Sequence, residues 1–276
     1  MESTEQLGAV HDRSRAMPAA GPIERFATPP HDDGPRLSVT LAATRRDIEA
    51  AQRLRYRVFA GEMGARLSGL AAGRDEDEFD AWCEHLIVRD ERCGEVVGTY
   101  RVLTAERAAR LGSFYADTEF DLARLAPLRP GMCEIGRACI HPDYRDGGAI
   151  MLLWQGLAAL MQERRCRTLI GCASIAMDDG GANALRVRRR LVRTHLAPDA
   201  NRVFPRRALP RLAEVPDAHD AAPAAIPALL KGYLRVGAWI GGEPAWDEAF
   251  GTADLFVMMP LERVEGRYAR HYLRAA

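Results

Sequence analysis

Two charged residues lie within a segment that otherwise has the pattern of a buried strand. Glu134 and Arg137 occur among apolar and small residues between Cys133 and Ile140. Buried charges are costly unless they are paired or used, so the pair indicates either a functional site or anchors for neighbouring loops. In the functional interpretation, Glu134 is a candidate for accepting a proton, directly or through water. Residues three apart on a strand point to opposite faces, so one ion pair between them would require a bulge.

A basic, glycine-rich turn follows this charged strand. Pro142 ends the strand, and the turn from Arg145 leads into an apolar segment over 148–165 that we expect to be a helix. The backbone N–H groups of the turn, the helix N-terminus and the Arg145 guanidinium all favour an anion. We therefore expect Arg145, Gly147 and Gly148 to hold a phosphate-bearing acyl donor, against the alternative that this is an ordinary turn.

The composition is that of a folded protein without a dominant charge. The chain has 276 residues, 47% of them hydrophobic, and a formal net charge of +0, which gives no global field for recruiting nucleic acid. Its six cysteines include no Cys-x-x-Cys pair, so we expect free thiols in a reducing compartment and no metal site. We see no signal peptide and no apolar run that could span a bilayer, so we expect a cytoplasmic protein, with peripheral inner-membrane contact left open.

The elements that position these residues are expected to form an α/β (α+β) layered domain, a mixed sheet flanked by helices. Residues 1–36, rich in Pro, Gly, Ala and charge, are expected to be a disordered leader, and residues 37–276 to form the domain with a C-terminal elaboration. Strands are expected over 37–41, 85–88, 96–103, 133–140, 168–174 and 253–259, and helices over 47–59, 148–165, 183–195 and 266–273.

The charged strand, the Arg-x-Gly-Gly turn and the long helix resemble the acyl-CoA-binding core of the Gcn5-related N-acetyltransferase fold. The spacing of further residues resembles the acyl-homoserine lactone synthases and, more closely, the L-ornithine N-α-acyltransferases of bacterial ornithine-lipid synthesis. The segments 229–233 and 242–247 also look like the latter family. The spaced residues are Arg55, Phe59, Asp77, Asp80, Arg101, Glu134 and Arg137.

The resemblance implies an N-acyltransferase that moves a 3-hydroxyacyl group from acyl carrier protein to the α-amine of L-ornithine. The product would be a lyso-ornithine lipid. A neutral amine would attack the thioester directly, with the oxyanion held by backbone N–H groups along 134–140. The resemblance implies no metal and no cofactor beyond the 4′-phosphopantetheine arm of the carrier protein.

The same resemblance assigns roles to the charged residues. Glu134 and Arg137 become catalytic candidates, and Arg55 and Phe59 become candidates for substrate binding. Ornithine carries two amines and a carboxylate, so Asp77 and Asp80 are expected to face its amines and Arg101 its carboxylate. The two aspartates have an open alternative, which is to pair Arg55 and Arg101 and so hold the loop.

The donor and its docking surface are assigned in the same way. Acetyl-CoA users of the fold favour a small residue where this chain has Ile150, and the bulkier side chain leaves less room for a CoA pyrophosphate. This favours an acyl carrier protein as the donor. Arginines over 186–193 on a predicted helix either dock that acidic protein or form a solvated face.

Three other functions remain open from the sequence. They are an acyl-homoserine lactone synthase using S-adenosylmethionine, an acetyl-CoA-dependent small-molecule N-acetyltransferase, and a non-catalytic membrane-active protein of the haemolysin type. The lactone synthases carry a tryptophan shortly after the phenylalanine, whereas no tryptophan lies between Phe59 and Asp77 here. The chain also lacks a strongly amphipathic apolar segment, which argues against lysis.

Overall fold

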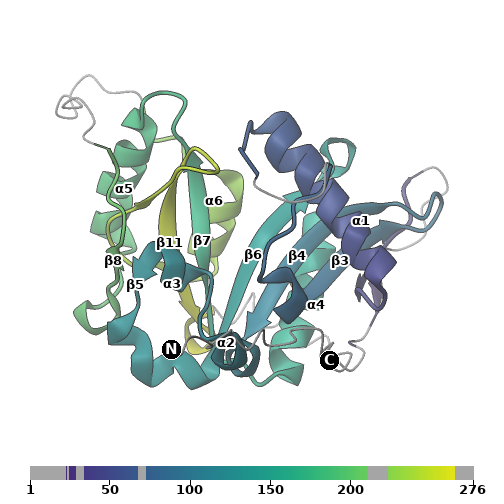
Figure 1. The fold of residues 1–276 in the computed structure, drawn as a ribbon, viewed down its shortest axis with the longest axis horizontal. Helices are drawn as coiled ribbons and strands as arrows, with labels where there is room; N and C mark the ends of the chain where they lie inside the picture. The colour runs from purple at the N-terminus through teal and green to yellow at the C-terminus, as the bar shows by residue number, and fades with distance from the viewer. Residues whose placement is uncertain (1–22, 24, 29–33, 68–72, 211–222, 265–276) are drawn as a thin grey trace, which may run out of the picture.

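The central feature is a nine-stranded sheet with helices on both faces (Figure 1), which confirms the expected fold class. The computed structural model describes residues 23, 25–28, 34–67, 73–210 and 223–264. The strand order is β1-β2-β3-β4-β6-β7-β11-β10, with β9 paired to β11, and among these pairs β6–β7 is parallel and the rest are antiparallel. The strands of this sheet are β1 (Phe26–Ala27), β2 (Leu37–Leu41), β3 (Glu84–Asp90), β4 (Val96–Thr104), β6 (Met132–Ile140), β7 (Thr168–Ala176), β9 (Trp239–Ile240), β10 (Ala245–Asp247) and β11 (Thr252–Pro260).

The described residues also form six α-helices, a second, two-stranded sheet, and short 3-10 and π-helical segments. β5 (Phe120–Asp121) pairs with β8 (Phe204–Pro205). The helices are α1 (Arg45–Tyr56), α2 (Ala105–Leu111), α3 (Ala116–Glu119), α4 (Gly148–Glu163), α5 (Ala182–Thr194) and α6 (Ala228–Arg235).

Helices α1 and α4 cover opposite faces of β3 and β4. Side chains alternate along a strand, so neighbours Tyr100 and Arg101 of β4 point to different faces. Tyr100 belongs to the core cluster that includes Leu153 of α4, and Arg101 forms an ion pair with Asp80, which also bonds Arg55 of α1. One face of the sheet therefore carries the apolar cluster of Tyr100, and the other carries buried charge beside a second apolar cluster that includes Leu103.

The start and end of α1 differ from the sequence expectation. The N-cap is Thr44, whose hydroxyl accepts the N–H of Asp47, while the Asp47 side chain accepts the N–H of Thr44 in a capping box. Asp47, where the expected helix begins, is therefore the third helical residue. After Tyr56, which is exposed, the chain continues as a π-helical turn, Arg57–Glu62.

Strands β6 and β7 pair only at their beginnings and then diverge. Their parallel register runs from Met132–Thr168 to Glu134–Ile170, and Figure 1 shows the two strands separating beyond it. At the point of divergence a Cβ on Gly171 would lie 2.5 Å from the Ile135 carbonyl oxygen, so only glycine fits there. The separation opens the sheet along one edge of β6.

A β-bulge on the opposite edge of β6 turns this strand further. In the β4–β6 ladder, Thr99 pairs with Cys139 and Arg101 pairs with Gly136, so Arg137 and Ala138 together oppose Tyr100. Arg137 adopts a φ of 50°, which is uncommon for a residue other than glycine. The extra residue changes which face the following side chains reach.

Two further expectations are corrected by the structure. Phe26 and Ala27 pair with β2, although they lie in the segment that we expected to be disordered up to residue 36. Cys133 and Cys166 form a disulfide with Cα atoms 5.9 Å apart, so the expectation of free thiols is wrong for this pair. The free cysteines are Cys83, Cys93, Cys139 and Cys172. The expected helix over 266–273 lies outside the described residues.

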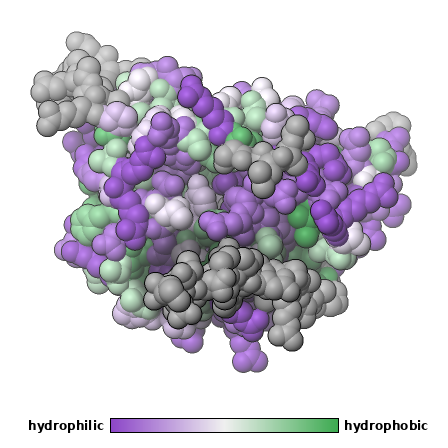
Figure 2. All heavy atoms as spheres, in the orientation of Figure 1, coloured by the Kyte–Doolittle hydropathy of each residue, from purple (hydrophilic) through white to green (hydrophobic). Residues whose placement is uncertain are grey.

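The surface carries few large apolar side chains. On the face shown in Figure 2 hydrophilic residues predominate and the apolar ones are scattered. Among the described residues, no helix is long and apolar enough to cross a membrane.

Candidate active site

A cavity of about 210 Å³ occupies the gap between the diverging strands β6 and β7. It is lined by Tyr100 from one face of β4 and by Arg101 from the other, so it passes through the sheet. One end is charged or aromatic and includes Glu134, Arg137 and Phe59. The other end is apolar and is closed by α6. The remaining lining residues include Met63, Phe79, Cys83, Tyr115, Cys172, Ser174, Pro227, Leu229, Leu230, Tyr233, Asp247, Phe250 and Asp254.

Glu134 contributes a buried carboxyl group to the cavity lining, and the pKa of this group is close to neutral pH. Its two oxygens accept the backbone N–H groups of Tyr115 (2.6 Å) and Ala116 (2.7 Å), at the start of α3. Burial raises the pKa of Glu134 to about 7, although these hydrogen bonds and the charge of Arg101 act in the opposite direction. A carboxylate with such a pKa matches the requirement for a general base at neutral pH.

Arg137 lines the same cavity as Glu134 because of the bulge. The expectation that the two side chains point to opposite faces is therefore wrong. Arg137 donates to Asp75 (3.1 Å) and Asp77 (3.1 Å), and its guanidinium lies over the rings of Tyr115 (5.2 Å) and Phe250 (4.7 Å). These contacts fix Arg137 without involving Glu134.

Arg55 forms the centre of a buried ionic network beside the cavity. Its side chain has no exposed surface and donates to Asp75 (2.8 Å) and to both carboxylate oxygens of Asp80 (2.8 Å each). Arg101, also buried, binds Asp77 and lies 3.2 Å from Asp80. Burial opposes the ionisation of Asp80, but Arg55 and Arg101 outweigh it and hold the pKa well below its usual range.

The network bears on the two roles that the sequence left open for Asp77 and Asp80. Both carboxylates bind arginines, and neither is among the residues that line the cavity. Arg55 is likewise outside the lining, whereas Arg101 and Phe59 contribute to it. The observed pairs are those of the second role, in which the aspartates hold the loop against α1 and β4, and substrate contact by these residues stays a prediction.

The turn that is expected to bind the donor leads into α4 as expected, and its Arg145 side chain binds other residues of the protein. Gly147, with a φ of 109°, is the N-cap of α4, and Gly148 is its first residue. Arg145 pairs with Glu62 (2.9 Å) and donates to the carbonyl of Ile140 (3.1 Å), the last residue of β6. The turn lies outside the cavity lining but adjoins the strand that leads into it. Donor binding here stays a prediction.

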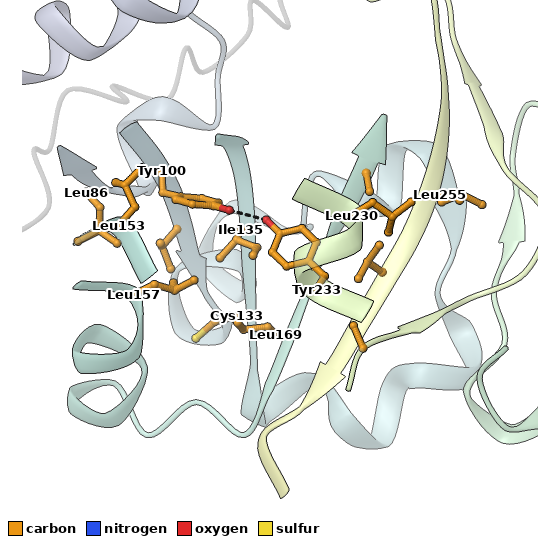
Figure 3. Close-up of a cluster of buried hydrophobic side chains, with 14 of the residues drawn as sticks. Leu86, Tyr100, Cys133, Ile135, Leu153, Leu157, Leu169, Leu230, Tyr233 and Leu255 are labelled. Carbon is orange, nitrogen blue, oxygen red and sulfur yellow. Dashed lines mark hydrogen bonds between the residues drawn. The ribbon is translucent and has the colours of Figure 1, made fainter. Parts of the chain in front are cut away.

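Two tyrosines that the sequence did not single out connect the cavity walls. The hydroxyls of Tyr100 on β4 and Tyr233 on α6 are 2.6 Å apart, as Figure 3 shows. Trp154 of α4 stacks on Tyr233, with ring centroids 6.1 Å apart and planes 6° from parallel. Helix α6 is thereby held across the apolar end of the cavity, beside the second turn of α4. Segment 229–233 was noticed in the sequence, but nothing there indicated a partner on β4.

The tyrosine contact can be tested by a double-mutant cycle. Tyr233→Phe removes one hydrogen bond between buried groups and should destabilise the fold by about 0.5–1.5 kcal/mol in urea unfolding. Tyr100→Phe breaks the same contact, so the double variant should lose less than the sum of the two single losses. Fully additive losses would mean that the hydroxyls do not interact.

Known proteins that resemble this chain identify its family. A family model described as "Acetyltransferase (GNAT) domain" matches residues 54–155, which include the end of α1, strands β3, β4 and β6, and the donor turn. Among solved structures, the acyl-homoserine lactone synthase LasI aligns with 84% of this chain and 96% of its own, at 12% identity and a TM-score of 0.47. That score is too low to support a conclusion.

Curated relatives match most of the chain. The L-ornithine N(alpha)-acyltransferase of Brucella abortus is 39% identical over 252 residues, covering 86% of this chain and 88% of the relative. The enzyme of the same name from Agrobacterium fabrum is 39% identical over 253 residues, covering 86% and 85%. With this identity over nearly the whole length, and with the acetyltransferase core around the cavity, the chain belongs to the family of L-ornithine N(alpha)-acyltransferases.

Proposed function

We propose that this enzyme transfers a 3-hydroxyacyl group from acyl carrier protein to the α-amine of L-ornithine and so forms a lyso-ornithine lipid. The observation that carries the proposal is the cavity through the sheet. It joins a buried carboxylate of near-neutral pKa to an apolar end of the kind that an acyl chain requires. The names of the curated relatives supply the acceptor.

The reaction follows from the position of Glu134. The neutral α-amine attacks the thioester carbonyl, Glu134 takes the amine proton directly or through water, and a C–N bond forms. The C–S bond then breaks, and the pantetheine thiolate leaves and is protonated by water. Beyond Glu134 the edge of β6 has no ladder partner on the side of the gap, so its N–H groups can face the oxyanion. The turn of Arg145, Gly147 and Gly148 would hold the phosphate of the arm.

A basic groove beside α6 supports a protein donor over a CoA thioester. Arg190 of α5 and Lys231 and Arg235 of α6 line a groove of about 380 Å³. Within the described residues, none of these three cations forms an ion pair. The other face of α6 carries Leu230 and Tyr233, which line the acyl end of the cavity. An acidic carrier protein bound at the groove would therefore lie next to the apolar end that we assign to its cargo.

The donor assignment predicts a clear preference in a steady-state assay with purified protein and ornithine. The same 3-hydroxyacyl group should transfer at least about tenfold more efficiently, as kcat/KM, from carrier protein than from CoA. The preference should shrink with added salt, because exposed charges are screened over roughly 8–10 Å at physiological ionic strength. Acylation of S-adenosylmethionine in place of ornithine would instead favour a lactone synthase, and equal use of acyl-CoA would refute the carrier-protein donor.

The groove itself is tested by charge reversal. Arg190→Glu combined with Lys231→Glu should raise the KM for acyl carrier protein and leave the KM for ornithine unchanged. Arg45→Glu is the matched control, because Arg45 is an exposed arginine on α1 with a surface partner, Glu49. A KM for the carrier protein that responds equally to both changes would remove the groove from the proposal.

A further inference from the structure

Besides Glu134, two carboxylates of the cavity lining have no ion pair among the described residues. Asp75, Asp77 and Asp80 are not among the lining residues, and arginines bind all three. Asp247 at the end of β10 and Asp254 in β11 do line the cavity, at 7% and 3% exposure. In the part of the chain that the structure describes, neither of these two forms an ion pair.

Neutral groups hold both carboxylates in place. Asp247 accepts the backbone N–H groups of Ala249 (2.9 Å) and Phe250 (3.1 Å) on one oxygen and the Tyr115 hydroxyl (3.3 Å) on the other. Asp254 accepts the Thr252 hydroxyl at 2.8 Å. Such contacts orient a carboxylate but do not pair it with a cation, and an unpaired buried charge is costly.

The electrostatics agree with a missing cation. Burial and the charge of Asp247 raise the pKa of Asp254 to about 6, although hydrogen bonds from Thr252 and Ser174 and the charge of Arg137 act in the opposite direction. Burial, Asp247 and Asp254 together raise the pKa of nearby Glu119 to about 7. A positively charged ligand group at Asp247 would reduce the repulsion among Asp247, Asp254 and Glu119. Asp77 and Asp80 already form ion pairs with arginines.

We propose that Asp247, assisted by Asp254, binds the side-chain ammonium of the acceptor and so selects a cationic amino acid. This inference rests on the proposed function and identifies the part of the cavity that recognises the second amine of ornithine. Tyr115 sets the spacing, since its backbone N–H binds Glu134 and its hydroxyl binds Asp247. The two carboxylates therefore lie within the span of one tyrosine, with the α-amine placed at Glu134 and the δ-ammonium at Asp247.

The test compares ornithine with norvaline, which has the same carbon chain and α-amine but no δ-amine. The native enzyme should prefer ornithine, and Asp247→Asn should lower kcat/KM for ornithine at least about tenfold while norvaline and the acyl donor are used as before. The amide still accepts the N–H groups of residues 249 and 250, so the turn is retained. Glu248→Gln is the matched control, because this neighbouring carboxylate is outside the cavity and pairs with Arg207.

Each outcome separates the subsite from the reaction. If Asp247→Asn lowers ornithine and norvaline turnover equally, Asp247 only supports the fold and the inference is overturned. The same follows if the native enzyme uses both acceptors equally. Calorimetric titration with ornithine reports binding without turnover. An enzyme that binds ornithine through Asp247 but does not acylate it would refute the proposed function alone, and equal binding by Asp247→Asn would refute the subsite alone.

Discussion

Replacement of Glu134 by glutamine is expected to lower kcat by on the order of 10²-fold or more while the protein remains folded. The carboxylate lines the cavity at the point where β6 and β7 diverge, and it is the buried acid there that α3 orients through two backbone N–H groups. Glutamine can still accept one of these hydrogen bonds, but it cannot accept a proton from the amine. Circular dichroism and the KM values for both substrates separate this loss from misfolding.

The pH profile distinguishes a base from an anchor. The pKa of Glu134 is raised to about 7, mainly by burial, so the carboxylate is protonated and inactive as a base below that pH. For the native enzyme, kcat/KM should therefore rise with pH and level off above about 7. In Glu134→Gln the residual rate should lack this limb. A folded variant with near-native turnover, or one that keeps the same limb, would reduce Glu134 to a structural role.

Much of the scaffold followed from the sequence because its signals are local. The apolar periodicity of 148–163 and the apolar runs of β4, β6, β7 and β11 gave these elements to within a few residues. The charged strand that the sequence singled out places Glu134 and Arg137 in the cavity lining, whereas the glycine-rich turn after it lies outside the lining. Such patterns depend on neighbours three to nine residues apart, which the sequence displays directly.

The ion-pair partners did not follow, because they depend on the register of distant strands. The bulge that gives Arg137 its positive φ arises because β6 has one more residue than β4 between two paired positions. No residue type in this part of the sequence indicates a bulge. Asp247 reaches the cavity from a hairpin more than a hundred residues after Glu134. Asp77 and Asp80 in the acidic segment 75–80 were expected to face the amines of ornithine. In the structure, three arginines from α1, β4 and β6 bind this segment.

Replacement of Arg55 by methionine is expected to destabilise the protein by about 3–5 kcal/mol, the range for removing one partner of a buried charge pair. Arg55 has no exposed surface and contacts both Asp75 and Asp80, so its loss leaves two buried carboxylates with weaker compensation. Arg53→Met is the matched control on the same helix. Arg53 is about half exposed and lies 3.9 Å from Glu49, and such surface pairs contribute only about 0–1 kcal/mol. Urea unfolding at neutral pH measures both.

The sign of the pH dependence and a second substitution identify the cause of that loss. The folded-state pKa of Asp80 lies below its unfolded value, so the stability from its pairs is present above the ordinary aspartate pKa and is lost as pH falls. The gap between native protein and Arg55→Met should therefore narrow below about pH 4. Adding Asp80→Asn to Arg55→Met should recover part of the loss, because it removes a buried charge that Arg55 no longer neutralises. A loss no larger than that of Arg53→Met would show that Arg55 does not hold α1 against the sheet. A double variant no more stable than Arg55→Met would assign the loss to packing of the arginine stem and not to its charge.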